Sequence, residues 1–330
     1  MAVGYRPPLP SELGECALVW YTAVDDYMAR LGRPLPSPYL DPLLALLRHL
    51  LTTDPQRFLV AVRPAHGATG HSAEQIVGFG IAAQREDVWF LSQLYVLPSE
   101  QGKGIGRALM MQILPSVETP ASQTAAARGD ETAEADDSQT ARSGVLAMCT
   151  DSAQPVSNGL YARLGIVPRV PVLNLVGTPN PSALARLPAG VEATPFGRSD
   201  PAADIATIDR AILGYAHPAD HAFLRTTGRD GFVFRTAGGE LLGYGYSSEA
   251  GRFGPIALLD ETLTATVIGH LMSTIRARGA TSAWVPGDND RAVVALLRAG
   301  LRIEGFPALL CWTRPFAGFE RYVIGSLALL

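Results

Sequence analysis

The residues of this sequence best suited to chemistry form a glycine-rich run, QGKGIG at positions 101–106, between a strand-like and a helix-like stretch. Gly102, Gly104 and Gly106 permit the positive φ angles that a nest of backbone N–H groups needs, and they leave no Cβ in the way of a phosphate. The helix expected after them directs its N-terminal dipole at the same anion. The run therefore predicts a pyrophosphate-binding turn. A strand-to-helix turn without a ligand is the alternative, because this is neither a Walker loop nor a GxGxxG fingerprint.

The wider segment, residues 94–109, resembles the acetyl-CoA motif of the GCN5-related N-acetyltransferase (GNAT) family, whose core is Gln/Arg-x-x-Gly-x-Gly/Ala. Gln101, Gly104 and Gly106 occupy its three fixed positions. The resemblance implies that acetyl-CoA is the acyl donor and that its pantetheine arm contacts the backbone of the fourth strand, in a gap between the fourth and fifth strands. The cofactor-binding positions expected on this basis are Leu94, Tyr95, Val96, Gln101, Gly102, Lys103, Gly104, Ile105, Gly106 and Arg107.

Attack of an amine on a thioester needs a base for the ammonium proton and an acid for the leaving thiolate. Tyr161 stands four residues before Gly165 and matches the family's tyrosine near the cofactor sulfur, so the resemblance makes it the candidate acid. A phenol with an ordinary pKa of about 10 can donate a proton to a thiolate. The alternative is a tyrosine whose ring packs on the sheet.

The family often has an asparagine seven residues before that tyrosine, where this chain has Gln154. Gln154 can make the same hydrogen bonds with a longer reach. Asn158 lies closer to Tyr161 but one helical turn from the family position. Both are expected near the cofactor.

Glu86, beside Asp87 in the turn between the third and fourth strands, is the candidate base. A solvated pair without a role, or proton loss through a water chain, are the alternatives, because acyl transfer in this fold depends largely on positioning. Asp25 and Asp26 in the first helix region either bind a cationic substrate or form a solvated helix face.

Composition limits the remaining choices. The chain has 330 residues, of which 47% are hydrophobic and 18% charged, and this favours two globular domains. A net charge of −4 without clustered Lys or Arg argues against nucleic-acid binding. We expect no membrane span, because no apolar run reaches about 18 residues, and no signal peptide.

The cysteines and histidines give no metal pattern. Cys16, Cys149 and Cys311 are widely separated, which is typical of reduced thiols in a cytoplasmic protein. His217 and His221 are four residues apart, but Pro218 intervenes, so we expect no helical metal pair. The prediction is a protein without a metal.

The sequence repeats itself weakly. The motif VGFG at 77–80 recurs as LGYG at 242–245, and the helix after the glycine run recurs 162 residues later. At that offset Gln101, Gly104 and Gly106 become Leu263, Thr266 and Ile268, so the second copy lacks the phosphate nest. At an offset of 135 residues, which applies to this later part of the chain, Tyr161 corresponds to Leu296.

A third match has an offset of only 135, so the first copy carries 27 extra residues. Residues 117–143 have that length and are rich in Ala, Thr, Ser, Glu and Asp, which predicts a mobile surface loop; a polar helix extension is the alternative. The strand-like and helix-like runs predict an α/β fold of two tandem GNAT-like domains, each a mixed, partly antiparallel sheet flanked by helices. The expected boundaries are 1–177 for the catalytic domain, 178–189 for a linker and 190–330 for a degenerate domain.

The first half ends one strand short, so we expect the last strand, residues 322–329, to pair with the first sheet. The functional prediction is a cytoplasmic N-acetyltransferase that uses acetyl-CoA and acts on a primary amine of a small molecule or peptide, by direct attack in a ternary complex. A homodimer is possible on this sequence. The alternative is a CoA-binding or acyl-CoA-binding sensor without catalysis.

Overall fold

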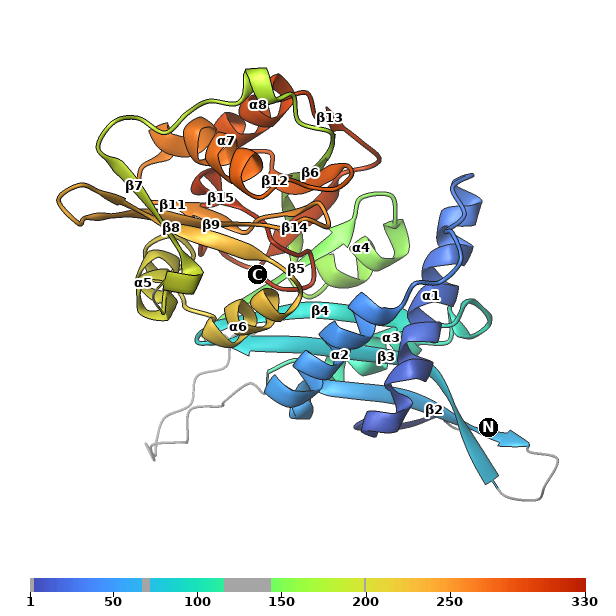
Figure 1. The fold of residues 1–330 in the computed structure, drawn as a ribbon. Coiled ribbons are helices and arrows are strands. Elements are labelled where there is room, and N and C mark those ends of the chain that lie inside the picture. Colours follow the sequence, from blue (N-terminus) through green and yellow to red (C-terminus); the bar gives the residue numbers. More distant parts are fainter. Residues whose placement is uncertain (1–2, 67–71, 116–143, 199) are drawn as a thin grey trace, which may run out of the picture.

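The computed structural model describes residues 3–66, 72–115, 144–198 and 200–330 (Figure 1). The predicted insertion at 117–143 lies outside the described residues. The elements of the first half are β1 (Gly4–Arg6), α1 (Leu13–Arg30), α2 (Asp41–Thr53), β2 (Phe58–His66), β3 (Ser72–Arg85), β4 (Val88–Val96), α3 (Ile105–Ile113), β5 (Val145–Asp151), α4 (Pro155–Ala162) and β6 (Val167–Gly177).

The second half has a similar order of strands and helices. Its elements are β7 (Val191–Pro195), α5 (Ala202–Ile212), α6 (Pro218–Thr226), β8 (Asp230–Thr236), β9 (Leu241–Ser247), β10 (Arg252–Phe253), β11 (Ile256–Leu258), α7 (Thr264–Thr274), β12 (Thr281–Pro286), α8 (Asp290–Arg298), β13 (Arg302–Ile303), β14 (Ala308–Trp312) and β15 (Tyr322–Val323).

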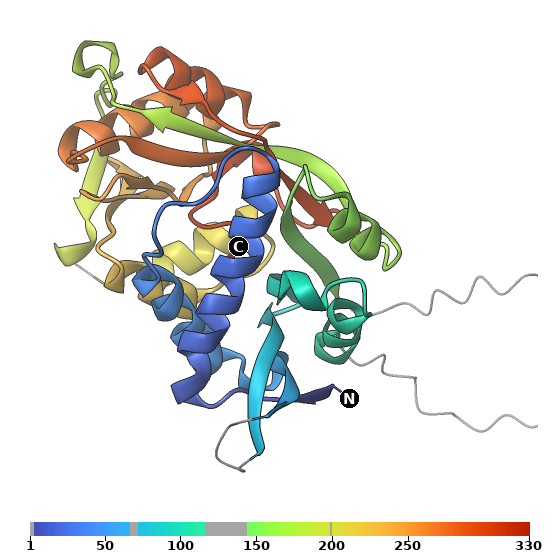
Figure 2. The ribbon, with the colours of Figure 1, turned by 90° about the vertical axis from the view of Figure 1, so that its right-hand side faces the viewer.

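Helices cover both faces of the first sheet. Successive side chains of a strand point to opposite faces, and these strands bury apolar side chains on both. Val60 of β2 and Phe79 of β3 pack under α1 and α2, whereas Ala61 of β2 and Val77 of β3 pack under α3. Figure 2 shows α1 and α3 on opposite sides of these strands. The predicted mixed sheet flanked by helices is confirmed.

One sheet runs through both halves of the chain. Its order is β1-β2-β3-β4-β5-β14-β6-β12-β10, and β13 also pairs with β6. β14 comes from the end of the sequence, yet it lies between β5 and β6, antiparallel to both. The second part of β6 in turn pairs with β12. Each half therefore completes its sheet with a strand of the other half.

This exchange corrects the prediction for residues 322–329. Their strand, β15, pairs with β11 in the second sheet, whose order is β15-β11-β9-β8-β7. The segment meets the first sheet through a single antiparallel bridge, from Ile324 to Trp284 of β12. The missing neighbour of β5 is β14, and the chain end contributes only the side chain of Leu329 to the core under α1 and α2. The strand ends at Val323, and the chain bends at Gly325, where a Cβ would lie 2.5 Å from Pro255.

A buried ion pair also joins the halves. The guanidinium of Arg85, at the end of β3, donates from Nε to Oδ2 of Asp220 on α6 at 2.7 Å and from Nη2 to Oδ1 at 2.8 Å. Its Nη1 donates to Asp54 at 2.8 Å, and His49 Nε2 lies 2.7 Å from Asp220 Oδ1. Burial alone would raise the pKa of Asp220, but its contacts with Arg85, His217 and His49 together outweigh burial and hold this pKa well below its usual range.

Candidate active site

The glycine-rich turn has the backbone geometry that its sequence predicts. Gly104 precedes α3 with φ 81°, and Gly102 has φ 75°; both angles favour glycine. The first backbone bond of the helix runs from Ala108 N–H to Gly104 C=O at 3.0 Å. The N–H groups of Ile105, Gly106 and Arg107 therefore have no partner within the helix. A Cβ added to Gly102 or Gly104 would meet no atom within 4 Å, so the turn is open to an anion.

Packing and polar contacts hold this turn in place. Ile105, Leu109, Met110 and Ile113 are buried beneath α3, and each contributes roughly 1.5–3 kcal/mol by its burial. The side chain of Gln101 donates from Nε2 to the Val96 carbonyl at 2.9 Å. That side chain therefore ties the turn to β4.

β4 and β5 separate beside the turn. They pair in parallel only from Val88 to Leu91 on β4, although the strands continue to Val96 and Asp151. The register of β4 against β3 shifts at the same level, which leaves Ser92 as an extra residue. The result is a gap, bordered by residues 92–96 on one side and the end of β5 on the other.

On the elements around this gap lie buried polar atoms that have no hydrogen-bond partner in the described part of the chain. They are Ser92 Oγ and Gln93 Oε1 on β4, Tyr27 Oη on α1 and Asn158 Oδ1 on α4. A buried polar atom without a partner costs about 1–3 kcal/mol. Such atoms beside an open strand edge suit a ligand with amide and hydroxyl groups, and the pantetheine arm of CoA has both.

Tyr161 lies at the inner end of the gap. It belongs to α4, is 5% exposed, and packs in one cluster with Leu91 and Met148, the last paired residues of β4 and β5. Its hydroxyl faces Ser157, one helical turn earlier, and Tyr95 of β4. Burial raises the pKa of Tyr161 above its usual value, so the hydroxyl keeps its proton at neutral pH.

Asp151 is the last residue of β5 and lies at the mouth of the gap. It was not among the candidate residues predicted from the sequence. Burial raises the pKa of Tyr27 to about 12, and the negative charge of Asp151 adds to this shift. Burial likewise raises the pKa of Tyr95, again with a contribution from Asp151. Asp151 therefore faces tyrosines from α1 and β4. The one available signal was its position at the end of the fifth predicted strand.

The other candidate residues lie in different places. Glu86 is in the turn before β4, on the order of 25 Å along the strand from Val96. Its carboxylate pairs with Arg210 at 2.8 Å. Asp25 accepts a bond from Leu35 N–H at 2.8 Å, and Asp26 pairs with Arg30, so both have partners within α1 and its following loop.

Gln154 and Asn158 both stay beside the site. Gln154 is the residue before α4, and its side chain does not cap the helix. Asn158 donates from Nδ2 to the Asp151 carbonyl at 3.2 Å, so it holds the end of β5 against α4. In the second half, Asn289 has a structural role: it caps α8 through Ala292 N–H and donates to the Tyr322 carbonyl at 3.1 Å.

The geometry agrees with a comparison of the sequence with protein families. The model of the acetyltransferase (GNAT) family matches residues 23–127, which include the glycine-rich turn and β4. Residues 23–127 are therefore similar to the GNAT family at the level of sequence. No curated protein matches the sequence at a significant level.

Solved GNAT structures share the fold along the whole chain. A candidate acetyltransferase from Pyrococcus horikoshii has a TM-score of 0.68 at 14% identity, over 99% of this chain and 95% of that one. A GCN5-related N-acetyltransferase from Sphaerobacter thermophilus has a TM-score of 0.57 at 14% identity, over 95% and 96%. A tandem GNAT protein from the clavulanic acid biosynthesis pathway has a TM-score of 0.54 at 14% identity, over 94% and 98%. The fold is therefore that of tandem GNAT proteins.

The second GNAT-like half has a different surface at the place of the phosphate turn. Asp260 and Glu261 precede α7, and the Asp260 carboxylate accepts a bond from Thr262 N–H at 2.9 Å. These carboxylates occupy the helix N-terminus that an anion would approach. The backbone of Ala185 also lies against α7, where a Cβ on Gly269 would be 2.1 Å from the Ala185 oxygen.

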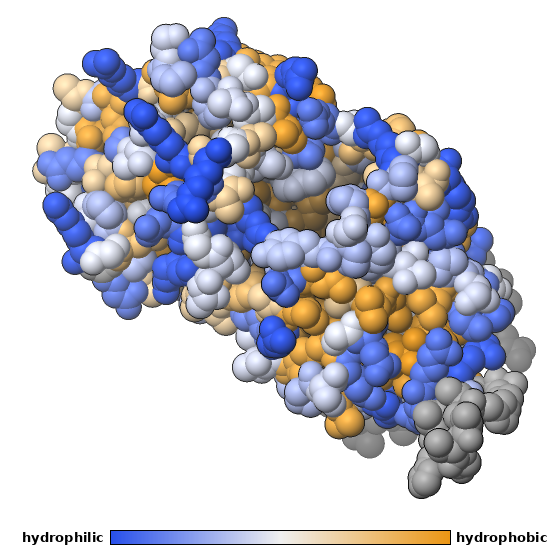
Figure 3. All heavy atoms as spheres, turned by 45° about the vertical axis from the view of Figure 1, so that its right-hand side comes forward, coloured by the Kyte–Doolittle hydropathy of each residue, from blue (hydrophilic) through white to orange (hydrophobic). Residues whose placement is uncertain are grey.

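The molecule is hollowed between its two lobes, on the side that carries α1 and α4 (Figures 1 and 3). Part of the floor of this hollow is apolar. In the described ranges, no helix is long and apolar enough to cross a membrane.

Proposed function

We propose that this chain transfers an acetyl group from acetyl-CoA to a primary amine, and that residues 1–177 carry the active site. The observation that carries the proposal is the joint occurrence of the open glycine turn and the gap between β4 and β5. The turn receives the pyrophosphate through the N–H groups around Gly104, and the arm lies along residues 94–96. The exposed side chains of Lys103 and Arg107 add positive charge beside the phosphates.

The thioester then reaches the inner end of the gap, beside Tyr161. The amine attacks the carbonyl carbon, the tetrahedral intermediate breaks its C–S bond, and Tyr161 donates its proton to the thiolate. Asp151 attracts the ammonium group of the acceptor and takes its proton, directly or through water. We place Asp151 in this role instead of Glu86, because Glu86 lies at the far end of β4.

The acceptor enters through the hollow between the lobes. Tyr27 of α1 and Tyr95 of β4 lie near Asp151, and Trp20 of α1 packs edge-on against Tyr95. These rings support an acceptor with a cationic amine and an apolar body. Residues 190–330 supply β14 and the far wall, and carboxylates stand where a second phosphate turn would be. We therefore propose one cofactor site per chain, in a cytoplasmic enzyme.

The burial of Tyr161 favours a second candidate function, a CoA or acyl-CoA sensor, because a tyrosine of 5% exposure suits a packing role. Steady-state kinetics with a panel of amines separates the two. We expect Tyr161→Phe and Asp151→Asn each to lower kcat/KM about 10²–10⁴-fold, the usual contribution of general acid–base catalysis. Glu86→Gln is the matched control and keeps its activity within about twofold, since surface ion pairs contribute little. Binding of acetyl-CoA without turnover of any amine would favour the sensor.

A further inference from the structure

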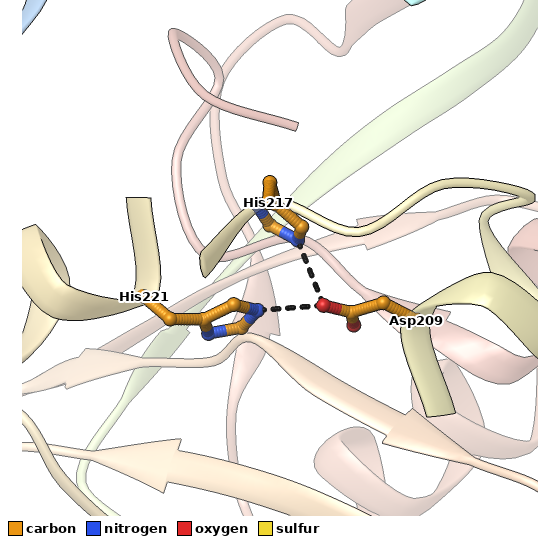
Figure 4. Close-up of side chains that lie close together, drawn as sticks. All are labelled: Asp209, His217 and His221. Atoms are coloured by element: carbon orange, nitrogen blue, oxygen red, sulfur yellow. Dashed lines mark hydrogen bonds and ion pairs between the residues drawn. The ribbon is translucent and has the colours of Figure 1, made fainter. Parts of the chain in front are cut away.

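Two histidines and one aspartate of the second half converge in the buried interior (Figure 4). Asp209 comes from α5, His217 directly precedes α6, and His221 lies in the first turn of α6. Nε2 of His221 is 2.9 Å from Asp209 Oδ2, and Nε2 of His217 is 3.4 Å from the same oxygen. All three residues are at most 2% exposed.

Pro218 makes this arrangement possible, contrary to the sequence argument. It occupies the first position of α6, where its missing N–H and fixed φ favour a helix start. The chain therefore becomes helical between the two histidines. Their rings lie on the same side, with centroids 4.3 Å apart.

His217 has no hydrogen-bond partner for either ring nitrogen among the described residues. Its Nε2 points at Asp209, and its Nδ1 lies 3.5 Å from Asp220 Oδ2. A buried ring without bonds costs about 1–3 kcal/mol. A ligand between His217 and Asp209 would remove this cost.

The supporting contacts direct one ligand atom on each of the other two residues toward the cluster. Tyr244 donates to Oδ1 of Asp209 at 2.6 Å, and Oδ2 shares a hydrogen bond with His221 Nε2 at 2.9 Å that a bound metal would replace. His221 Nδ1 lies 2.9 Å from the Tyr246 hydroxyl, which fixes its Nε2 toward Asp209. Metal-binding histidines in proteins are held by such a contact at their second nitrogen.

We propose that Asp209, His217 and His221 bind a divalent transition metal of the zinc type. Two imidazoles and one carboxylate suit Zn²⁺, whereas Ca²⁺ and Mg²⁺ prefer oxygen ligands. With metal–ligand bonds of about 2.0–2.1 Å, tetrahedral ligand atoms lie roughly 3.3 Å apart. The separations of 2.9 and 3.4 Å to Asp209 are close to this value, and all three ligand atoms lie within 4.8 Å of one another.

The surroundings allow a cation and one solvent ligand. The carboxylates of Asp209 and Asp220 flank the two imidazoles, and Arg85 is engaged by Asp54 and Asp220. A small pocket beside Asp209 and His221 offers room for a water molecule as the fourth ligand. Arg225 also lines this pocket, and its side chain faces Tyr246. The metal would fix α6, which carries Asp220 to the first half, against α5.

Titration of the untagged, metal-free full chain with Co²⁺ tests the site independently of acetyl transfer. We expect one Co²⁺ per chain, with the visible absorption of a tetrahedral ion, displacement by Zn²⁺, and a higher midpoint of thermal unfolding when Zn²⁺ is present. His217→Ala weakens Co²⁺ binding by roughly a hundredfold or more. His49→Ala is the matched control and retains binding, because His49 contacts Asp220 but not Asp209.

The unchanged chain already decides the question if a variant fails to fold. Absence of Co²⁺ and Zn²⁺ binding by this chain at micromolar concentrations would mean that the cluster is only a hydrogen-bonded set of side chains. Binding that survives in folded His217→Ala and His221→Gln variants would place the metal elsewhere. Either result overturns the proposal.

Discussion

The buried Arg85–Asp220 pair gives a sharp stability prediction for the contact between the halves. Arg85→Met removes two charge-assisted bonds to Asp220 and one to Asp54. Asp220 is 1% exposed and keeps its contacts with His49 and His217, while Asp54 keeps its bond from Gln84 N–H at 2.9 Å. Loss of one partner of a buried ion pair costs about 3–5 kcal/mol. The retained contacts place the expected loss near the lower end, about 3 kcal/mol.

Denaturant and thermal unfolding of the full chain measure this loss. At about 2–4 °C per kcal/mol for a large domain, we expect the midpoint of thermal unfolding to fall by roughly 6–12 °C. Arg210→Met is the matched control, because Arg210–Glu86 also joins the halves but its side chains are 58% and 44% exposed. An exposed pair contributes about 0–1 kcal/mol. Equal effects of the two substitutions would refute the argument that burial makes the Arg85 pair important.

Three further predictions concern pH and chain integrity. The folded-state pKa of Asp220 is depressed, so the stability that its ionised form provides is fully present above the unfolded pKa of about 3.9 and is lost as the pH falls below that value. We therefore expect the free energy of unfolding to decline more steeply below pH 4 in the native chain than in Arg85→Met. Parallel declines in the two proteins would contradict this. Because burial raises the pKa of Tyr161, we expect no fall in kcat from deprotonation of the general acid up to about pH 10, when the amine is saturating. A fall in kcat near pH 8 would exclude Tyr161 as the general acid. Residues 1–189 expressed alone lack β14, so we expect an unstable or aggregating fragment in circular dichroism and light scattering, and a stable monomer would show that β14 is dispensable.

Local sequence patterns predicted most of the elements that surround the site. Short runs rich in β-branched and aromatic residues indicated the strands β2, β3 and β4, and the glycines at 102 and 104 indicated a turn with positive φ. These features depend on neighbours in the sequence, so a single chain is enough to recognise them.

Pairing and contacts between residues far apart in the sequence could not be predicted in the same way. β14 has the same local pattern whether it pairs within its own half or with β5, and only the completed sheet selects β5 and β6. Asp151 gains its place because β4 and β5 separate after Leu91. Pro218 looked like a helix breaker between two histidines, although proline is favoured at the first helical position, where α6 begins.

The central claim is that the chain has one acetyl-CoA site, at the glycine turn. Isothermal titration of acetyl-CoA into the native chain, Gly104→Glu and Gly239→Glu tests it. Gly239 is the matched control, because its φ of 89° is also positive and a Cβ there also meets no atom within 4 Å. We expect one site per chain, lost in Gly104→Glu and unchanged in Gly239→Glu. Two sites per chain, or binding that survives Gly104→Glu, would contradict the assignment to the first half, and no binding by the native chain would contradict acetyl-CoA as the donor.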